Sequence, residues 1–165
     1  MTLTVTGARD ELSSFVERSS GLPPGHLVNL VAGARGPSSP TAAGWTEGIE
    51  DELWISLAAE AAAQLSFAGH LPTPTGPADG GERRWRSERW GTAEDVEGLT
   101  VVAATPHALE LRFGTADTPP EGWLAHVVEC HPSLGFRLSF VADDGSTWVM
   151  EACAGKPLRH RRGQG

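Results

Sequence analysis

The sequence is poor in the residues that several classes of protein require. It has only two cysteines, Cys130 and Cys153, which could form one disulfide bond but no disulfide framework, as expected in a reducing compartment. No stretch approaches the ~20 apolar residues of a membrane span, and residues 1–10 contain neither the basic start nor the apolar run of an export signal. We therefore expect a cytoplasmic protein without membrane contact.

Basic residues are also scarce, with 13 against 21 acidic residues, and the formal net charge is −8. Affinity for nucleic acid comes mostly from Lys and Arg side chains that neutralise phosphates, so this balance disfavours a general DNA-coating role. At 165 residues, of which 39% are hydrophobic, the chain is long enough for one domain with its own core.

Hydrophobic patterning predicts an α+β domain. Alternation of apolar and polar residues predicts five strands, at 2–6, 99–103, 108–113, 136–140 and 148–152. Apolar residues at helical spacing predict three helices, at 10–20, 46–64 and 119–131. The order of these elements is typical of a ferredoxin-like split βαβ fold, with helices on one face of an antiparallel sheet and an extra C-terminal hairpin strand.

The same order leaves a long insertion after the first helix. We expect a single ferredoxin-like domain over 1–155, with an insertion at about 21–81 that is partly loop, at 33–44 and 72–81. Residues 156–165 are expected to form a basic flexible tail, because short charged termini usually fray.

Strand alternation also predicts the composition of the two sheet faces. Apolar strand residues should point at the helices, which leaves a polar open face of Thr2, Thr4, Thr6, Glu110, Arg112, Arg137 and Ser139. This face lacks the aromatic residues on which RRM-type domains stack bases, so RNA binding of that type is disfavoured.

The strongest local signal is a helix start at 118–121. Thr118 can cap the first amides, Pro119 fits the first helical position, and Glu121 completes a capping box. A helix start can bind an anion, but here Thr118 and Glu121 are expected to occupy its donors.

Several short motifs together resemble the YubB ferredoxin-like domain family of small bacterial, plasmid and phage proteins. They occur in the family's order, at 3–7, 65–67 with Pro72 and Pro74, 90–92 with Asp95, 113–116 with Pro119-Pro120, 122–124, and 131–132. The chain departs from the family at Ala93-Glu94 and Asp117, where aromatic residues are lost, and in lacking the family's N-terminal lead. The resemblance implies a fold and an association with mobile genetic elements, but no reaction.

The segment 82–90 alternates four arginines and two tryptophans. It could bind single-stranded nucleic acid, with guanidinium groups on phosphates and indoles stacked on bases. The interpretation that we favour is structural: in a strand or loop, Trp85 and Trp90 would fill the core while the arginines are solvated or pair with Glu82 and Glu88.

Metal and catalytic motifs are incomplete. His126 and Cys130 could share a zinc ion on one helix face, but no second paired motif completes a tetrahedral set. Cys130 is instead expected to be a small buried residue, and His131 to bond the last helix carbonyls. Asp95, Asp117 and His126 are catalytic candidates without a nucleophile elbow or phosphate loop around them. We therefore predict no cofactor and no metal, and do not favour an enzyme.

Three hypotheses on function remain. The first is a non-enzymatic module that binds an unknown protein partner, the second is single-stranded nucleic-acid binding through 83–90 and the basic tail, and the third is a small hydrolase centred on Asp95 or His126. Trp90-Gly91-Thr92 is expected to meet the segment around Thr115 in space. The candidate binding residues are Trp85, Arg86, Arg89, Trp90, Gly91, Thr92, Asp95, Thr115, Pro119, Pro120 and Trp123.

Overall fold

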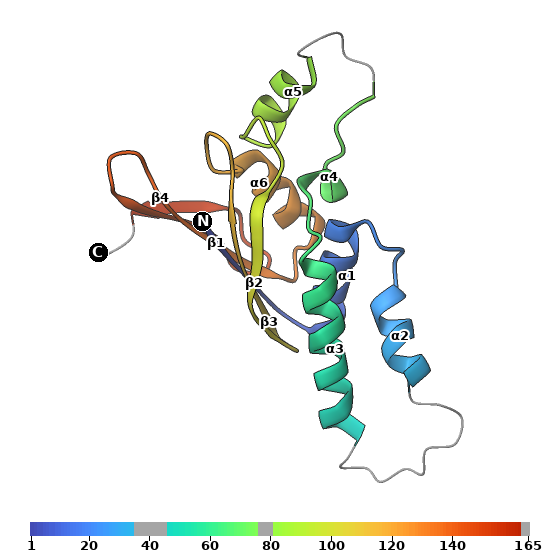
Figure 1. Ribbon diagram of the computed structural model, residues 1–165. Helices are drawn as coiled ribbons and strands as arrows, with labels where there is room; N and C mark the ends of the chain where they lie inside the picture. Colours follow the sequence, from blue (N-terminus) through green and yellow to red (C-terminus); the bar gives the residue numbers. More distant parts are fainter. Residues whose placement is uncertain (35–45, 76–80, 163–165) are drawn as a thin grey trace.

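A six-stranded antiparallel sheet runs through the molecule. The computed structural model describes residues 1–34, 46–75 and 81–162. Its strands are β1 (Thr2–Thr6), β2 (Glu97–Thr105), β3 (Ala108–Gly114), β4 (Gly135–Val141), β5 (Thr147–Ala152) and β6 (Arg159–Arg162). They lie in the order β2-β3-β1-β4-β5-β6, and every neighbouring pair is antiparallel (Figure 1). This α+β arrangement is consistent with a ferredoxin-like kind of fold.

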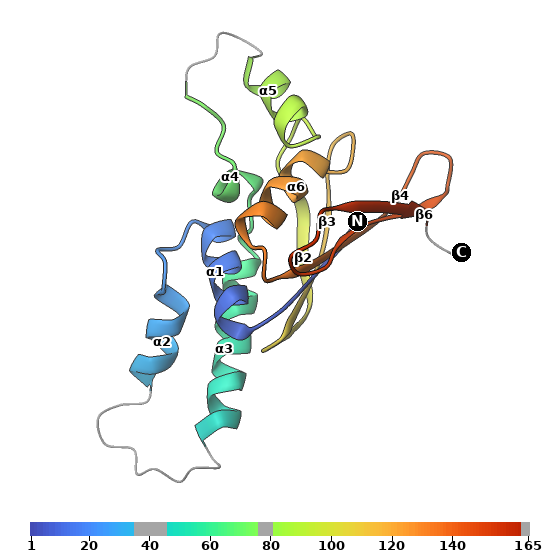
Figure 2. The same ribbon diagram turned by 180° about the vertical axis from the view of Figure 1, so that it is seen from behind.

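Six helices accompany the sheet in the described part of the chain. They are α1 (Arg9–Ser20), α2 (His26–Ala34), α3 (Thr46–Ala62), α4 (Phe67–His70), α5 (Gly81–Arg89) and α6 (Glu121–Cys130). Figure 2 shows α1 and α6 on the same side of the sheet. None of these helices is both long and apolar enough to cross a bilayer.

The core lies between the sheet and the helices α1 and α6. In the central strand β1, Leu3 pairs with Leu111 of β3 and Leu138 of β4, and all three side chains are fully buried. Phe113 is also buried and Phe140 packs against the core, as the alternation predicts. Burial of apolar side chains on one sheet face is the main driving force for this arrangement.

The insertion contains more helix than the sequence indicates. The predicted helix over 46–64 is confirmed as α3, but α2 was not predicted. The N-terminus of α2 is capped by the carboxylate of Glu17, which accepts hydrogen bonds of 2.7 Å from the N–H groups of Gly25 and Leu27. A cap supplied from another helix leaves no local sequence signal. Of the predicted loops, residues 35–44 and 76–80 lie outside the described residues.

Two further predictions about local structure are wrong. The segment 82–90 is neither strand nor loop, because its first eight residues belong to helix α5. Thr118 does not cap α6: the helix begins at Glu121 with Pro120 at its N-cap position and no side-chain cap. The Thr118 hydroxyl instead donates to the carbonyl of Gly91.

The flexible tail predicted for residues 156–165 is also wrong in part, because four of these residues form a strand. Arg159–Arg162 forms β6, which pairs with β5 along its whole length. Side-chain contacts support this pairing: Leu158, just before the strand, packs against the core, and the His160 imidazole and the Arg161 guanidinium each lie 3.0 Å from a carboxylate, of Glu121 and Glu151, respectively. Residues 163–165 lie outside the described residues.

Candidate binding surface

The three tryptophans singled out by the sequence are packed together inside the molecule. Trp90 and Trp123 are 1% and 0% exposed, and both rings contact Phe67, with ring centroids 5.7 and 4.7 Å away. Trp85 is partly buried, with its ring edge against Trp90. These rings therefore fill a core and leave no open cleft in which a base could stack.

The motif around Trp90 meets the start of α6, as the sequence predicts. The Trp90 carbonyl accepts a hydrogen bond of 3.1 Å from the N–H of Trp123, and the Gly91 carbonyl accepts one from Thr118. Carbonyl groups that follow α5 thus occupy donors at the N-terminus of α6. An end-to-end contact of this kind satisfies terminal groups of both helices.

Gly122 allows this contact between the helices. A Cβ atom at this position would lie 2.2 Å from the carbonyl oxygen of Arg89, which belongs to the backbone and cannot move aside cheaply. Backbone of α5 therefore sits where a side chain or an anion would otherwise approach the first turn of α6. We assign no anion site to this helix start.

Asp95 has a structural role in the same region. Its carboxylate accepts hydrogen bonds from the Ser66 hydroxyl and from the N–H groups of Phe67 and Val96, the latter two at 2.8 Å. These bonds hold the first turn of α4. The other predicted binding residues near the start of α6 are Gly91, Thr92, Thr115, Pro119 and Pro120. Of these, Thr92 and Pro120 are buried.

Most of the positive charge of α5 is neutralised locally. Arg84, Arg86 and Arg83 lie 2.8, 3.6 and 3.6 Å from Glu88, Glu82 and Glu94, respectively. Arg86 also lies over the Trp90 ring, 5.3 Å from its centroid. Arg89 is exposed and has no acidic partner among the described residues. The pairing expected with Glu82 and Glu88 is thus present.

Two buried histidines line the core between α1, α4 and α6. His70 is 2% exposed, and its Nε2 lies 2.8 Å from the Ser19 hydroxyl, which itself donates to the Phe15 carbonyl. Because the Ser19 hydroxyl donates its proton to the Phe15 carbonyl, the Nε2–H of His70 donates to the Ser19 oxygen. Burial lowers the pKa of His70 to about 3, assisted by the neighbouring charges of His131 and Arg18. Burial also lowers the pKa of His131.

His126 and Cys130, which the sequence offers only as an incomplete zinc pair, contact each other and the backbone of the protein. The Nε2 atom of His126 lies 3.2 Å from the His70 carbonyl and 3.4 Å from the Cys130 sulfur. A carbonyl oxygen only accepts, so this nitrogen carries a proton and is not free to bind a metal ion. Across the described ranges, no group of three or more His, Cys, Asp or Glu side chains could hold a metal ion. Cys130 is half-buried and Cys153 is exposed.

The open face of the sheet presents a different set of polar residues. Along one row of cross-strand neighbours, Glu110, Thr4, Arg137, Glu151 and Arg159 follow one another from β3 to β6. A second row includes Arg112, Thr2, Ser139, Val149 and Arg161. Val149 is apolar and only 3% exposed. The predicted open-face residues of β1, β3 and β4 are confirmed on this face, and β6 adds two arginines to it.

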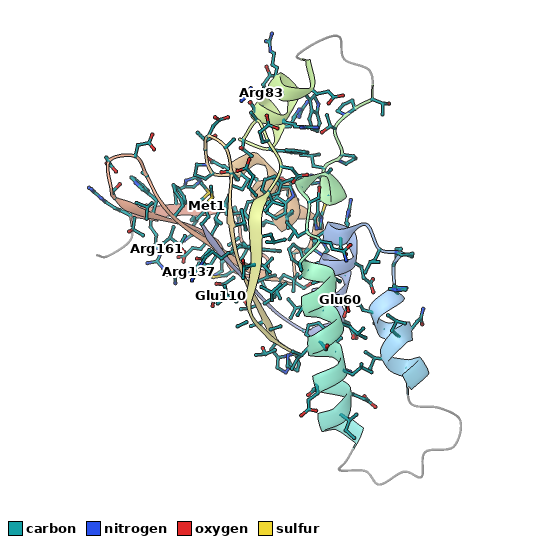
Figure 3. All side chains as sticks on the ribbon, in the orientation of Figure 1. Met1, Glu60, Arg83, Glu110, Arg137 and Arg161 are labelled. Atoms are coloured by element: carbon teal, nitrogen blue, oxygen red, sulfur yellow. The ribbon has the colours of Figure 1, made fainter. Side chains whose placement is uncertain are left out.

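Figure 3 shows Glu110, Arg137 and Arg161 on the side of the sheet away from the helices, whereas Arg83 projects from α5. On the open face, Arg161 pairs with Glu151 at 3.0 Å. Arg112, Arg137 and Arg159 are exposed and have no acidic partner in the described part of the chain. We call Arg112, Arg137, Arg159 and Arg161 the sheet cluster.

A shallow depression of about 460 Å³ lies beside Arg137 on this face. Its polar lining comes from β1, β4 and the end of β5, with Thr4, Thr6, Ser133, Arg137, Glu151 and Cys153. Sequence reasoning identified part of this lining as open-face residues but did not name it as a site. The depression depends on residues from β1, β4 and β5 that are distant in the sequence, so no local pattern indicates it.

No protein-family model matches the chain, and no curated protein or solved structure is significantly similar to it.

Proposed function

We propose that the protein is a non-enzymatic interaction module that binds a protein partner on the open face of its sheet. The observation that carries this proposal is a set of three exposed arginines, Arg112, Arg137 and Arg159, that have no acidic partner within residues 1–34, 46–75 and 81–162 and lie on a face that also holds the depression. Exposed charges that the chain does not pair internally are available to a ligand.

The sign of the charge on this face favours an acidic partner. The face carries the four arginines of the sheet cluster against three glutamates, Glu110, Glu151 and Glu97, the last of which lies opposite Gly114 of β3, so its net charge is positive by one. The chain as a whole carries −8. A local positive field on an acidic protein steers acidic partners to one surface and repels them from the rest.

The strand order supports the ferredoxin-like assignment. The strands β2-β3-β1-β4 have the order expected of two split βαβ units, with α1 and α6 in the two crossovers. Two of the motifs on which the resemblance to the YubB family rests, at 90–92 and 122–124, contact each other through the hydrogen bond from the Trp123 N–H to the Trp90 carbonyl. This supports their interpretation as structural residues of the fold.

The two alternative functions have less support from the geometry. Nucleic-acid binding through α5 requires stacking rings, whereas Trp90 is buried and three of the four arginines have glutamate partners. Hydrolysis requires a free base and nucleophile, whereas the Asp95 carboxylate accepts three hydrogen bonds and His126 donates to a backbone carbonyl.

Selection of peptides from a random-sequence display library against the full chain tests the proposal. We expect acidic sequences, with affinity weakened about tenfold by Arg137→Glu because a charge on the binding face is reversed. Arg84→Glu on α5 is the matched control and should leave the affinity unchanged. Loss of binding in the α5 variant alone, or a selection that yields no binder, would overturn the proposal.

A further inference from the structure

The two edge strands of the sheet differ in regularity. β2 borders α3, and its pairing with β3 shifts register between Glu97 and Thr100 and again between Val101 and Ala103. Bulged and covered edges resist the addition of another strand. β6 pairs with β5 without a shift, and among the described residues no strand lies along its outer side. β6 therefore presents a regular row of unpaired backbone N–H and C=O groups.

The side chains of β6 restrict which strand can pair with it. All four are exposed; Arg159 and Arg161 lie on the open face, and His160 and Arg162 on the other. A second copy of β6 in antiparallel pairing would place arginines of the two copies opposite one another, which is destabilising. The same charges attract a strand that carries carboxylates.

An extended peptide fits this edge better than a nucleic acid does. A peptide strand supplies both donors and acceptors and so matches the N–H and the C=O groups of the edge. Phosphate oxygens only accept, which would leave the edge carbonyls unmatched. The residues of β6 also include no Trp, Tyr or Phe on which a base could stack.

We infer that an acidic, extended segment of the partner adds to the sheet as a seventh strand along the outer edge of β6. This inference rests on the interaction function proposed above. In such a strand, successive side chains alternate between the faces. Carboxylates at every second position would therefore lie beside Arg159 and Arg161.

The probe is a fluorescein-labelled peptide of alternating glutamate and valine, and its binding to the full chain is measured by fluorescence anisotropy. Two control peptides have the same sequence with N-methyl groups on alternate backbone amides, one in each register. N-methylation removes backbone donors and keeps the charge. We expect one register to bind at least about tenfold more weakly than the parent peptide. Equal binding of all three peptides would overturn the inference.

Variants of the protein locate the contact. Arg159→Glu should weaken binding of the parent peptide, and Arg159→Gln should weaken it less, whereas Arg84→Glu on α5 should have no effect. Amide hydrogen exchange supplies a readout that charge attraction alone would not change, because outward N–H groups of β6 should become protected in the complex. Unchanged exchange of these amides would count against strand addition.

The failures of the two proposals can be told apart. If library-selected peptides respond to Arg137→Glu but leave β6 exchange unchanged, strand addition is wrong and the interaction function stands. If no peptide binds, both are wrong. Tighter, competing binding of a labelled oligothymidylate, with a steeper salt dependence, would overturn both in favour of nucleic acid.

Discussion

The arginines of α5 and those of the sheet cluster illustrate two different uses of the same residue. In α5, arginines alternate with glutamates at helical i, i+4 spacing, so Arg84 and Arg86 find partners on their own helix. In the sheet, neighbours in space come from different strands, and among the residues that the structure describes Arg161 is the one member of the sheet cluster that pairs with a carboxylate. Among the described residues, most arginines of the dense run in α5 therefore have acidic partners within 4 Å, whereas most of the scattered arginines of the sheet cluster have none.

The comparison extends to what lies beneath each set. Under α5, the rings of Trp85, Trp90 and Trp123 are packed into the core. The arginines of the sheet cluster instead lie on the outer surface of the strands, next to the shallow depression beside Arg137. The α5 region is thus expected to determine stability, and the open face to determine binding.

The largest effect is expected from Trp90→Ala. The indole is 1% exposed and donates a 2.8 Å hydrogen bond to the Leu71 carbonyl. Its removal leaves a large cavity and should lower the free energy of unfolding by about 3–5 kcal/mol. Urea denaturation followed by tryptophan fluorescence or circular dichroism measures this loss. A midpoint equal to that of the parent chain would refute the structural role of the α5 region.

Acidification should produce the next largest effect. The pKa of His70 is about 3 in the folded protein and close to 6.5 when unfolded. Below pH 6.5 the unfolded chain therefore binds a proton that the folded chain does not, and stability present above pH 6.5 is lost as the pH falls. At pH 5 the loss from His70 is about 2 kcal/mol, and His131 adds to it in the same direction.

Denaturation midpoints at pH 7 and pH 5 measure this dependence. A His70→Asn variant is the control, because its stability should fall less steeply between these pH values. The His70 ring should also show no NMR titration over this range while the protein is folded. Titration of the His70 ring near pH 6.5 would contradict the lowered pKa of this buried histidine.

A smaller effect is expected on binding. Arg137→Ala removes one exposed, unpaired charge from the open face, so the affinity for an acidic peptide should fall about three- to tenfold without a change in stability. Anisotropy titration measures this change, with Arg89→Ala as the matched exposed, unpaired arginine on α5. Equal losses in the two variants would remove the distinction between the two regions.

The smallest effect is expected from the double variant Arg84→Ala, Glu88→Ala. The side chains of Arg84 and Glu88 are 83% and 60% exposed, so solvent screening removes most of the contribution of this pair. The urea midpoint should not change measurably, and neither should peptide affinity. A clear loss of affinity here would show that α5 takes part in binding.

Most of the sheet could be predicted from the sequence because alternation is local. Leu3 and Val5, or Leu109 and Leu111, mark the buried face by themselves, and Gly21 marks the end of α1 through its left-handed conformation at φ 72°. The predicted polar composition of the open face, including Arg137, follows from the same rule.

The rest depends on partners that are distant in the sequence. Thr118 has the residue type of a helix cap, but its hydroxyl is used by Gly91, which lies 27 positions away. The start of α2 depends on Glu17, and β6 is a strand because β5 offers it an edge. Sequence patterns indicate which residues are suited to a role, whereas tertiary contacts decide which role they take.

The close approach at Gly122 has a consequence for the tolerance of the chain to substitution. The protein has 20 glycines, and the residue type alone indicates only that the backbone can adopt many conformations at each of them. In a saturation library selected for correct folding, position 122 should remain glycine, because even a methyl group would collide with the Arg89 carbonyl. At Gly33 and Gly48, where an added methyl group would meet nothing, alanine should be accepted freely. Gly122 is thus required for the close approach of α5 to α6, and its replacement would push the ends of these two helices apart.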